Sequence, residues 1–414
     1  MRAIPGTALR TRLRQRADYT HKHNLKTGRH GWLRLTPAYS VKVVEDLISE
    51  RLAARRILDP FCGTATTALS AACHGHEGVT MDINPFLVWF GRTKLGTYSL
   101  ATIDATRAAC ARALSLVQRK TIAPAPCPPI HNIKRWWAAD SLDFLRATKA
   151  AIQAVTDART AERALLQIAF CRTMIVLSNA AFNHQSMSFK DGERMAFARD
   201  RADIFAGHVG FVLSGAADNP AGSGRVLLGD ARNPSAVLNG PFDLVVTSPP
   251  YANRISYIRE LRPYMYWLDY LVDGRDAGDR DWSAIGGTWG IATSRLIAWK
   301  RGTDRLDNPT LQRVLEGISH CDNKSGTILA NYVAKYFDDM WTHLQNLTAV
   351  LAPQAEVHYI VGNSTFYGIL LSTEQIYAEM LAELGFSQIE CRPIRKRNSK
   401  KELIEFDVTA RWQN

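Results

Sequence analysis

The chain has 414 residues, of which 46% are hydrophobic and 22% charged, so it can form one large domain or a core with a long insertion. Its formal net charge of +12 indicates a polyanionic partner. The seven cysteines include no Cys-x-x-Cys pair, which argues against a zinc site or a disulfide framework and favours a cytoplasmic protein. No apolar run approaches the length of a membrane span, so we expect no membrane partner.

The amino-terminal segment is basic, because residues 1–17 contain five arginines and no acidic residue. This composition fits an organelle transit peptide, an arm that lies on nucleic-acid phosphates, or a disordered start. His21, His23 and His30 follow, but their spacing is not that of a metal site on a helix. Apolar residues at helical spacing predict a helix from Pro37 to Ile48.

A glycine-containing loop follows the first predicted strand. Ile57 and Leu58 end that strand, and the run DPFCGTAT from Asp59 leads into a helix that begins near Ala68. Gly63 has no Cβ and tolerates unusual dihedral angles, so the backbone there can approach a ligand closely. A strand–loop–helix unit of this kind is typical of a loop that cradles a ligand.

A second strand ends at Asp82, about twenty residues beyond the glycine loop. This is the usual spacing of the acid that binds both ribose hydroxyls in a Rossmann-type unit, since a carboxylate accepts two hydrogen bonds from a diol. Asp82 could instead cap the helix that begins at Asn84-Pro85. A nicotinamide cofactor is disfavoured, because only one glycine of the G-x-G-x-x-G pattern is present.

Residues 97–224 do not fit the pattern of strands alternating with helices. They contain helical tracts at Ala101–Gln118 and Glu162–Asn179 and a proline-rich loop at Ala123–Pro129. We interpret them as a helical insertion between the second and third core strands. Cys127 follows a proline, as the nucleophile of cytosine-C5 methyltransferases does, but no strand precedes it, so we reject that role.

The stretch Phe242–Tyr251 (FDLVVTSPPY) organises the rest of the chain. Its apolar run predicts a buried strand, and Pro249-Pro250 must end it because neither proline has an N–H to donate. Ser248 and the carbonyls around Pro249 can accept hydrogen bonds from an amino group, and Tyr251 offers a face on which a base can stack. We predict a rigid clamp for a planar amine at the carboxyl edge of the sheet, where ligands bind in such folds.

Ser-Pro-Pro-Tyr after a hydrophobic strand resembles the catalytic motif of the DNA amino-methyltransferases, which methylate an exocyclic nitrogen of cytosine or adenine. The form that begins with serine is typical of cytosine-N4 enzymes. The loop at Asp59 resembles the S-adenosylmethionine-binding loop of the same family, and the Asp230 region resembles the segment that binds the adenine amino group. The resemblance implies that Ser248, Pro249, Pro250 and Tyr251 are catalytic, and that the cofactor contacts Thr36, Tyr39, Asp59, Pro60, Phe61, Gly63, Thr64, Asp82, Ile83, Asp230 and Ala231.

The same resemblance implies an α/β fold of the Rossmann-like, S-adenosylmethionine-dependent methyltransferase type. We expect a mostly parallel seven-stranded sheet with an antiparallel closing strand. Residues 1–96 would form the arm, a pocket helix and the cofactor-binding half. Residues 97–224 would form the helical insertion, and 225–414 the catalytic half with a variable region near 273–326.

The implied function is site-specific methylation of cytosine N4 in a flipped-out base of double-stranded DNA, in a prokaryotic cytoplasm. A cognate restriction endonuclease that acts on the same site is a further candidate partner. Alternatives are adenine-N6 methylation, an RNA amine methyltransferase, and a non-catalytic nucleic-acid-binding module. Three features are candidate DNA contacts: Trp136-Trp137, Asn183–Asp191, and the basic turn Arg395–Lys401 between two closing strands. For the tryptophans, burial is the competing reading.

Overall fold

The fold was analysed in a computed structural model. It describes residues 13–35, 39–51, 53, 55–181, 188–189, 200–253, 256–287, 291–303, 305–321, 325–397 and 403–414. Within these ranges, no helix is both long enough and apolar enough to cross a membrane. The predicted DNA-contact stretch Asn183–Asp191 lies outside them, except for Ser188 and Phe189.

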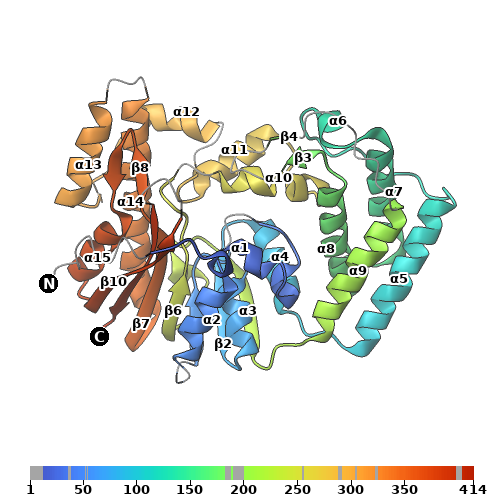
Figure 1. The fold of residues 1–414 in the computed structure, drawn as a ribbon, viewed down its shortest axis with the longest axis horizontal. Coiled ribbons are helices and arrows are strands. Elements are labelled where there is room, and N and C mark those ends of the chain that lie inside the picture. Colours follow the sequence, from blue (N-terminus) through green and yellow to red (C-terminus); the bar gives the residue numbers. More distant parts are fainter. Residues whose placement is uncertain are drawn as a thin grey trace.

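A seven-stranded sheet organises the molecule (Figure 1). All neighbouring pairs are parallel except those made by β11, which lies between β7 and β10 and is antiparallel to both. This arrangement confirms the predicted methyltransferase-type Rossmann-like fold with an antiparallel closing strand. In spatial order the strands are β10 (Ser387–Lys396), β11 (Ile404–Arg411), β7 (Leu351–Gly362), β6 (Phe242–Thr247), β1 (Arg56–Asp59), β2 (Glu77–Asp82) and β5 (Ser223–Leu228).

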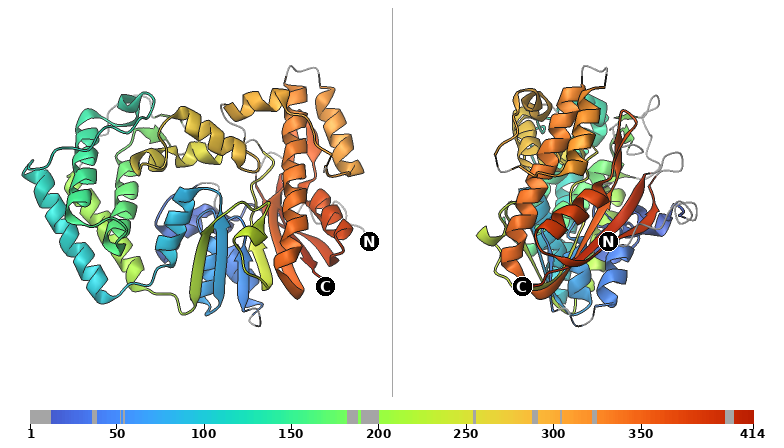
Figure 2. Two further views of the ribbon diagram at one scale, coloured as in Figure 1. Left: turned by 180° about the vertical axis from the view of Figure 1, so that it is seen from behind. Right: turned by 90° about the vertical axis from the view of Figure 1, so that its left-hand side faces the viewer.

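Helices cover both faces of the sheet, as the alternation of buried side chains along the strands requires. Ile57 and Leu244 pack on one face with α2, whereas Leu58 and Val245 pack on the other with α14. Figure 2 shows the same arrangement from two further sides. The first face is covered by α2 (Val41–Ser49), α3 (Thr66–Cys73) and α4 (Pro85–Leu95), and the second by α14 (Gly326–Leu347) and α15 (Thr373–Glu383).

Strand β7 begins at Leu351 and is the longest strand of the central sheet. Pro353 lies inside it, although proline cannot donate to the ladder. The pairing with β6 shifts at this point, and Gln354 has a φ of +62°, so an irregularity accommodates the proline.

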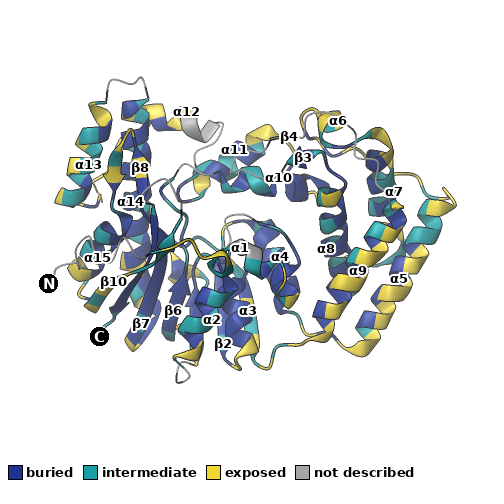
Figure 3. Cartoon of the chain, viewed as in Figure 1, coloured by how far each residue is buried: buried dark blue, intermediate teal, exposed yellow. Residues whose placement is uncertain are grey.

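The predicted helical insertion is confirmed, and it forms a bundle at the end of the molecule opposite α13 (Figure 1). Its helices bury their inner sides and expose their outer sides, as Figure 3 shows. Trp137 is fully buried there and Trp136 is half-buried, so packing explains the pair better than base stacking does. The elements are α5 (Leu100–Gln118), α6 (Ile133–Trp136), α7 (Ala139–Val155), α8 (Ala161–Val176), β3 (Ala180–Ala181), β4 (Ser188–Phe189) and α9 (Arg201–Ala217).

One buried arginine anchors this bundle to the core. All five N–H donors of the Arg29 guanidinium meet oxygen atoms, and none of these belongs to a carboxylate. Two acceptors lie at the end of α4 and two at the end of α9, where carbonyl groups lack partners within the helix. The acceptors are the carbonyls of Lys94, Gly96, Gly215 and Ala216 and the Asn219 side chain, at 2.6 to 3.0 Å.

The segment after the Ser-Pro-Pro-Tyr motif is helical. The polar, glycine-rich stretch 273–326 contains three helices, and a short hairpin follows β7. Near the amino terminus, α1 (His21–Asn24) is a single turn. The further elements are α10 (Tyr257–Trp267), α11 (Gly274–Ser283), α12 (Ile291–Ala298), α13 (Pro309–Ser319), β8 (Ser364–Phe366) and β9 (Ile369–Leu371).

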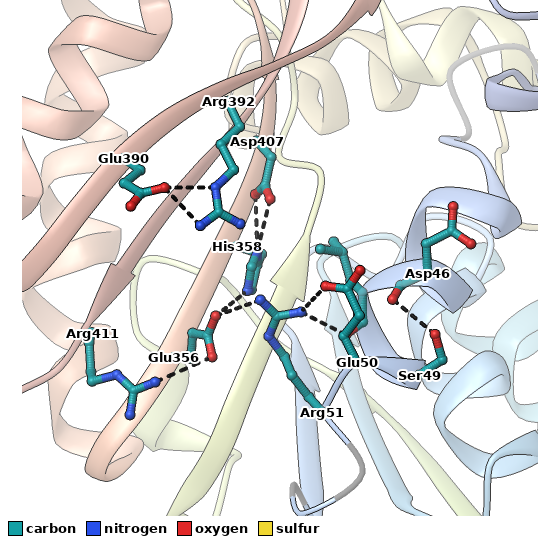
Figure 4. A network of polar contacts seen from close by, with 11 residues as sticks. Asp46, Ser49, Glu50, Arg51, Glu356, His358, Glu390, Arg392, Asp407 and Arg411 are labelled. Carbon is teal, nitrogen blue, oxygen red and sulfur yellow. Dashed lines mark hydrogen bonds and ion pairs between the residues drawn. The ribbon is translucent and has the colours of Figure 1, made fainter. Parts of the chain in front are cut away.

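A buried ionic network ties β7 to β11 and to the end of α2 (Figure 4). His358 is fully buried, with Nδ1 3.0 Å from Asp407 and Nε2 2.9 Å from Glu356. Arg51 also contacts Glu356 at 2.7 Å, and Arg411 lies 3.7 Å from it. Burial alone would lower the pKa of His358, but the hydrogen bonds to the two carboxylates outweigh it and raise that pKa.

Because the folded state raises the pKa of His358, its imidazolium stabilises the fold fully below about pH 6.5, the pKa of an unfolded histidine. This stability is lost as the pH rises through the folded-state value. We therefore expect His358→Gln to lower the free energy of unfolding by about 1–3 kcal/mol at pH 6 and by less at pH 9. Urea denaturation at both pH values would measure this, and an equal loss at both would contradict a charged His358.

Candidate active site

The parallel strands all end at one edge of the sheet, and a cavity of about 1700 Å³ opens there. Thirteen of the fifteen residues predicted to be catalytic or cofactor-binding line it. Of the other two, Asp59 is buried beneath the cavity, and Thr36 lies outside the described residues. The lining residues are Tyr39, Pro60, Phe61, Gly63, Thr64, Asp82, Ile83, Asp230, Ala231, Ser248, Pro249, Pro250 and Tyr251.

The glycine loop is held open toward the cavity by Asp82. Gly63 has a φ of +48°, a conformation that a residue with a Cβ rarely adopts. Its N–H donates to the Asp82 carboxylate at 3.0 Å, and the Asn84 N–H donates to the other oxygen at 2.8 Å. Burial raises the pKa of Asp82 to about 6 despite these bonds. Each carboxylate oxygen retains a lone pair, so Asp82 can still accept from a diol.

Asp59 joins the glycine loop to the catalytic strand. One of its oxygens accepts a 2.6 Å hydrogen bond from the Thr247 hydroxyl, next to Ser248, and a 3.0 Å bond from the Phe61 N–H. The other oxygen, Oδ2, is buried and accepts no hydrogen bond from the part of the chain that the structure describes. Burial raises the pKa of Asp59 to about 7. An unpaired, buried acceptor of this kind fits a cationic ligand group, reached directly or through water.

Asp230 is paired with a residue that the sequence did not single out. Arg232 binds its carboxylate with Nε and Nη2, at 2.6 to 3.1 Å, and also contacts Asp339. The hydrogen bonds and charge of Arg232 lower the pKa of Asp230, although burial opposes this. Asp230 is therefore a charged acceptor whose orientation is fixed. Ile83 is 37% exposed on the same cavity and offers an apolar surface to a flat ligand.

The Ser-Pro-Pro-Tyr segment is fixed by tyrosines from other helices. The Tyr336 hydroxyl donates to the Pro250 carbonyl at 2.8 Å, and the Tyr251 N–H donates to the Tyr257 hydroxyl at 2.9 Å. Ser248 donates its hydroxyl hydrogen to the carbonyl of Ile360 at 3.1 Å. Because that hydrogen is already used, the lone pairs of the Ser248 oxygen are available to accept from an amino group.

A second group of residues that the sequence did not assign to the active site surrounds the Tyr251 ring. Its hydroxyl donates to Glu405 at 3.0 Å, and Arg395 binds the same carboxylate at 2.8 and 3.0 Å. The Arg397 guanidinium lies 4.9 Å from the ring centroid and donates to the Asn363 carbonyl at 2.8 Å. Two residues of the basic turn predicted to contact DNA phosphates thus contact the site itself.

The amino-terminal segment contributes to the cavity wall. Gln15, Arg16 and Ala17 line it, and the Arg14 carbonyl accepts from the Lys396 N–H at 3.2 Å, beside the edge strand β10. Farther along, the Tyr39 hydroxyl contacts Thr67 at the start of α3. Among the residues with described positions, no group of three or more His, Cys, Asp or Glu could hold a metal ion.

Comparisons with known proteins returned a curated relative and a solved structure. No family model matches the chain. A curated relative, type II methyltransferase M.MvaI of Kocuria varians, is 22% identical over 347 residues, which cover 79% of this chain and 74% of that protein. The chain is a methyltransferase. The solved rRNA methyltransferase aviRa of Streptomyces viridochromogenes is 10% identical, with a TM-score of 0.31 over 95% of this chain and 96% of that one.

The buried carboxylate of Asp59 in the methyltransferase site lowers the stability of the ligand-free fold at neutral pH. Because the folded state raises this pKa, the ionised carboxylate destabilises the fold increasingly as the pH rises from about 4 toward 7. Asp59→Asn keeps an oxygen acceptor for Thr247 and Phe61 without the charge. We expect the variant to gain about 1–3 kcal/mol of unfolding free energy at pH 8 and less at pH 5.

Chemical denaturation of the ligand-free protein at the two pH values would measure this gain. Asp307→Asn is the control, because Asp307 is exposed and its change should leave stability nearly unaltered. A loss of stability in Asp59→Asn at pH 8 would show that the ionised Asp59 carboxylate does not destabilise the fold.

Proposed function

We propose that this methyltransferase transfers a methyl group from S-adenosylmethionine to the exocyclic N4 of cytosine in double-stranded DNA. One observation carries the proposal: the glycine loop and the Ser-Pro-Pro-Tyr segment line a single cavity. Its volume of about 1700 Å³ exceeds the roughly 300–1,000 Å³ of a typical small-ligand site, so it has room for a cofactor and a base together. The net charge of +12 and the type II methyltransferase relative support DNA as the substrate.

The residues at the cavity fit S-adenosylmethionine. Gly63 gives it open backbone, Asp82 keeps two acceptor oxygens for the ribose hydroxyls, and Asp59 keeps one for the ammonium group. Asp230 is oriented to accept from the adenine amino group, with Ile83 against the ring. When bound, this cofactor supplies a methyl group made electrophilic by its sulfonium.

The Ser-Pro-Pro-Tyr segment activates the acceptor nitrogen. An exocyclic amine is a poor nucleophile, because its lone pair is delocalised into the ring. Ser248 and a carbonyl that flanks Pro249 accept hydrogen bonds from its two N–H groups and favour a pyramidal nitrogen. Tyr251 stacks on the base, held by Glu405 and Arg397. Methyl transfer from the bound cofactor to this nitrogen would release the thioether form of the cofactor and, to solvent, one proton from the amine, so no covalent enzyme intermediate would be needed.

The target base must leave the DNA stack to reach this clamp, since Ser248 and Tyr251 are half-buried at the cavity. Orientation then supplies most of the rate, because the sheet edge holds the two ligand sites in fixed relation. The cationic methyl donor also explains why the protein keeps buried carboxylates at this edge.

Expression in a bacterial host without DNA methylation, followed by single-molecule sequencing, tests the proposal. We expect N4-methylcytosine at one defined sequence. Methylated adenine in place of methylated cytosine would show that adenine is the target base. Unmethylated DNA together with activity on RNA would overturn the proposal.

Ser248→Ala removes one acceptor from the amine and should lower the rate of methyl transfer about 10- to 100-fold. Cofactor affinity should change little, because Ser248 lies on the base side of the cavity. Single-turnover kinetics and calorimetric titration would separate the two effects. Ser235→Ala is the matched control, since Ser235 is exposed and does not line the cavity. Full activity in Ser248→Ala would rule out its assigned role.

Asp59→Asn should show the reverse pattern. Loss of the carboxylate removes the partner of the ammonium group, so we expect cofactor affinity to fall about tenfold or more while stability rises. Calorimetric titration with S-adenosylmethionine would measure the affinity, with Asp307→Asn again as the control. Unchanged affinity would mean that Asp59 serves the fold alone.

A further inference from the structure

A tight hairpin rises from the carboxyl end of β7, directly after the strand that supports the catalytic segment. Strands β8 and β9 pair Thr365 with Leu370 and Phe366 with Ile369, so only Tyr367 and Gly368 form the turn. Both have positive φ, +50° and +84°. This is the pattern of a type I′ turn, in which Asn-Gly and Gly-Gly are the preferred pairs.

Tyrosine is an unfavourable choice at that position. A non-glycine residue in the left-handed region costs about 1 kcal/mol, and asparagine is tolerated there because its short side chain bonds locally. Tyr367 is nevertheless 42% exposed. Within the described ranges, its ring makes no hydrogen bond or aromatic contact that would offset the cost. Strained residues that packing does not explain occur most often at functional sites.

The hairpin packs against α13 and α14, beside the catalytic segment. Phe366 and Leu371 are buried, and Ile369 packs on Gly317 of α13. The Phe366 ring lies 6.2 Å from that of Tyr332, whose hydroxyl is 3.5 Å from the Tyr251 carbonyl. One tyrosine therefore links the base of the hairpin to the Ser-Pro-Pro-Tyr segment.

The tip faces the same cavity as the clamp, because Tyr367 lines it together with Ser248 and Tyr251. A base that leaves a duplex breaks its pairing and stacking, which costs a few kcal/mol and opens a gap in the helix. DNA-bending proteins fill such gaps with apolar or aromatic side chains inserted between base steps. An exposed aromatic ring on a short, braced turn has the shape and chemistry for this task.

We infer that Tyr367 enters the base stack of duplex DNA where the target base leaves it, an inference that rests on the function proposed above. Leu370 lies on the same hairpin, is 40% exposed, and does not line the cavity. The two side chains are alike in exposure and differ in position, so Leu370 provides a matched control.

The test uses the full-length protein and a duplex that contains the sequence mapped by single-molecule sequencing. Tyr367→Asn should lower kcat/KM on this duplex about tenfold or more, because the gap is no longer filled. On a duplex whose target base faces an abasic position, the variant should recover to within about 3-fold of the unaltered protein, since that base is already unpaired. Leu370→Ala should match the unaltered protein on both duplexes.

Thermal unfolding keeps a folding defect apart from a functional one. Asn-Gly is a preferred type I′ pair, so Tyr367→Asn should unfold at the same or a higher temperature than the unaltered protein. Equal activity of Tyr367→Asn and the unaltered protein on the paired duplex would overturn the inference. So would an equal loss on the paired and the abasic duplex. In either case the proposed function stands, whereas failure of the unaltered protein to methylate any DNA would remove both.

Discussion

The site depends on one hydrogen bond between two strand ends, from the Thr247 hydroxyl to the Asp59 carboxylate at 2.6 Å. Strands β1 and β6 pair in parallel, with Leu58 opposite Val245, so their carboxyl ends lie side by side. The backbone hydrogen bonds of the sheet end here, and this side-chain bond fixes the loop after β1 relative to the segment after β6. Two ligands bound at the ends of these two strands would then be held close enough to react with each other without a covalent link to the protein.

This arrangement places carboxylates at the carboxyl edge of the sheet, where burial makes their charge unfavourable for the fold. Burial raises the pKa values of both Asp59 and Asp82, which means that neither carboxylate is fully compensated by its neighbours. The cationic cofactor proposed above would supply the missing compensation. Asp230 differs, because Arg232 balances its charge within the protein. Its carboxylate can therefore orient a ligand through hydrogen bonds but attracts a cation less strongly.

The parts of the site that sequence reasoning predicted are those whose signal is local. Gly63, Asp82 and Ser248 each follow a short apolar strand, and strand ends of a parallel sheet share one edge. The supporting residues were missed, because tertiary packing decides their contacts. Tyr332 and Tyr336 are four residues apart on α14, a spacing that marks one helix face but says nothing about what that face meets. Arg232 was also missed, although it lies only two residues after Asp230 and its pairing with that carboxylate could have been predicted from this spacing.

The five hydrogen bonds of Arg29 have a mechanical consequence. They join the carboxyl-terminal ends of α4 and α9 to the segment before α2 that contains Arg29. Four of the five acceptors are backbone carbonyls, which move less than the ends of long side chains. The helical bundle is thereby coupled stiffly to the sheet and cannot swing independently about its connections. Strain from docking a large substrate would therefore fall on the substrate rather than on the junction between the bundle and the sheet.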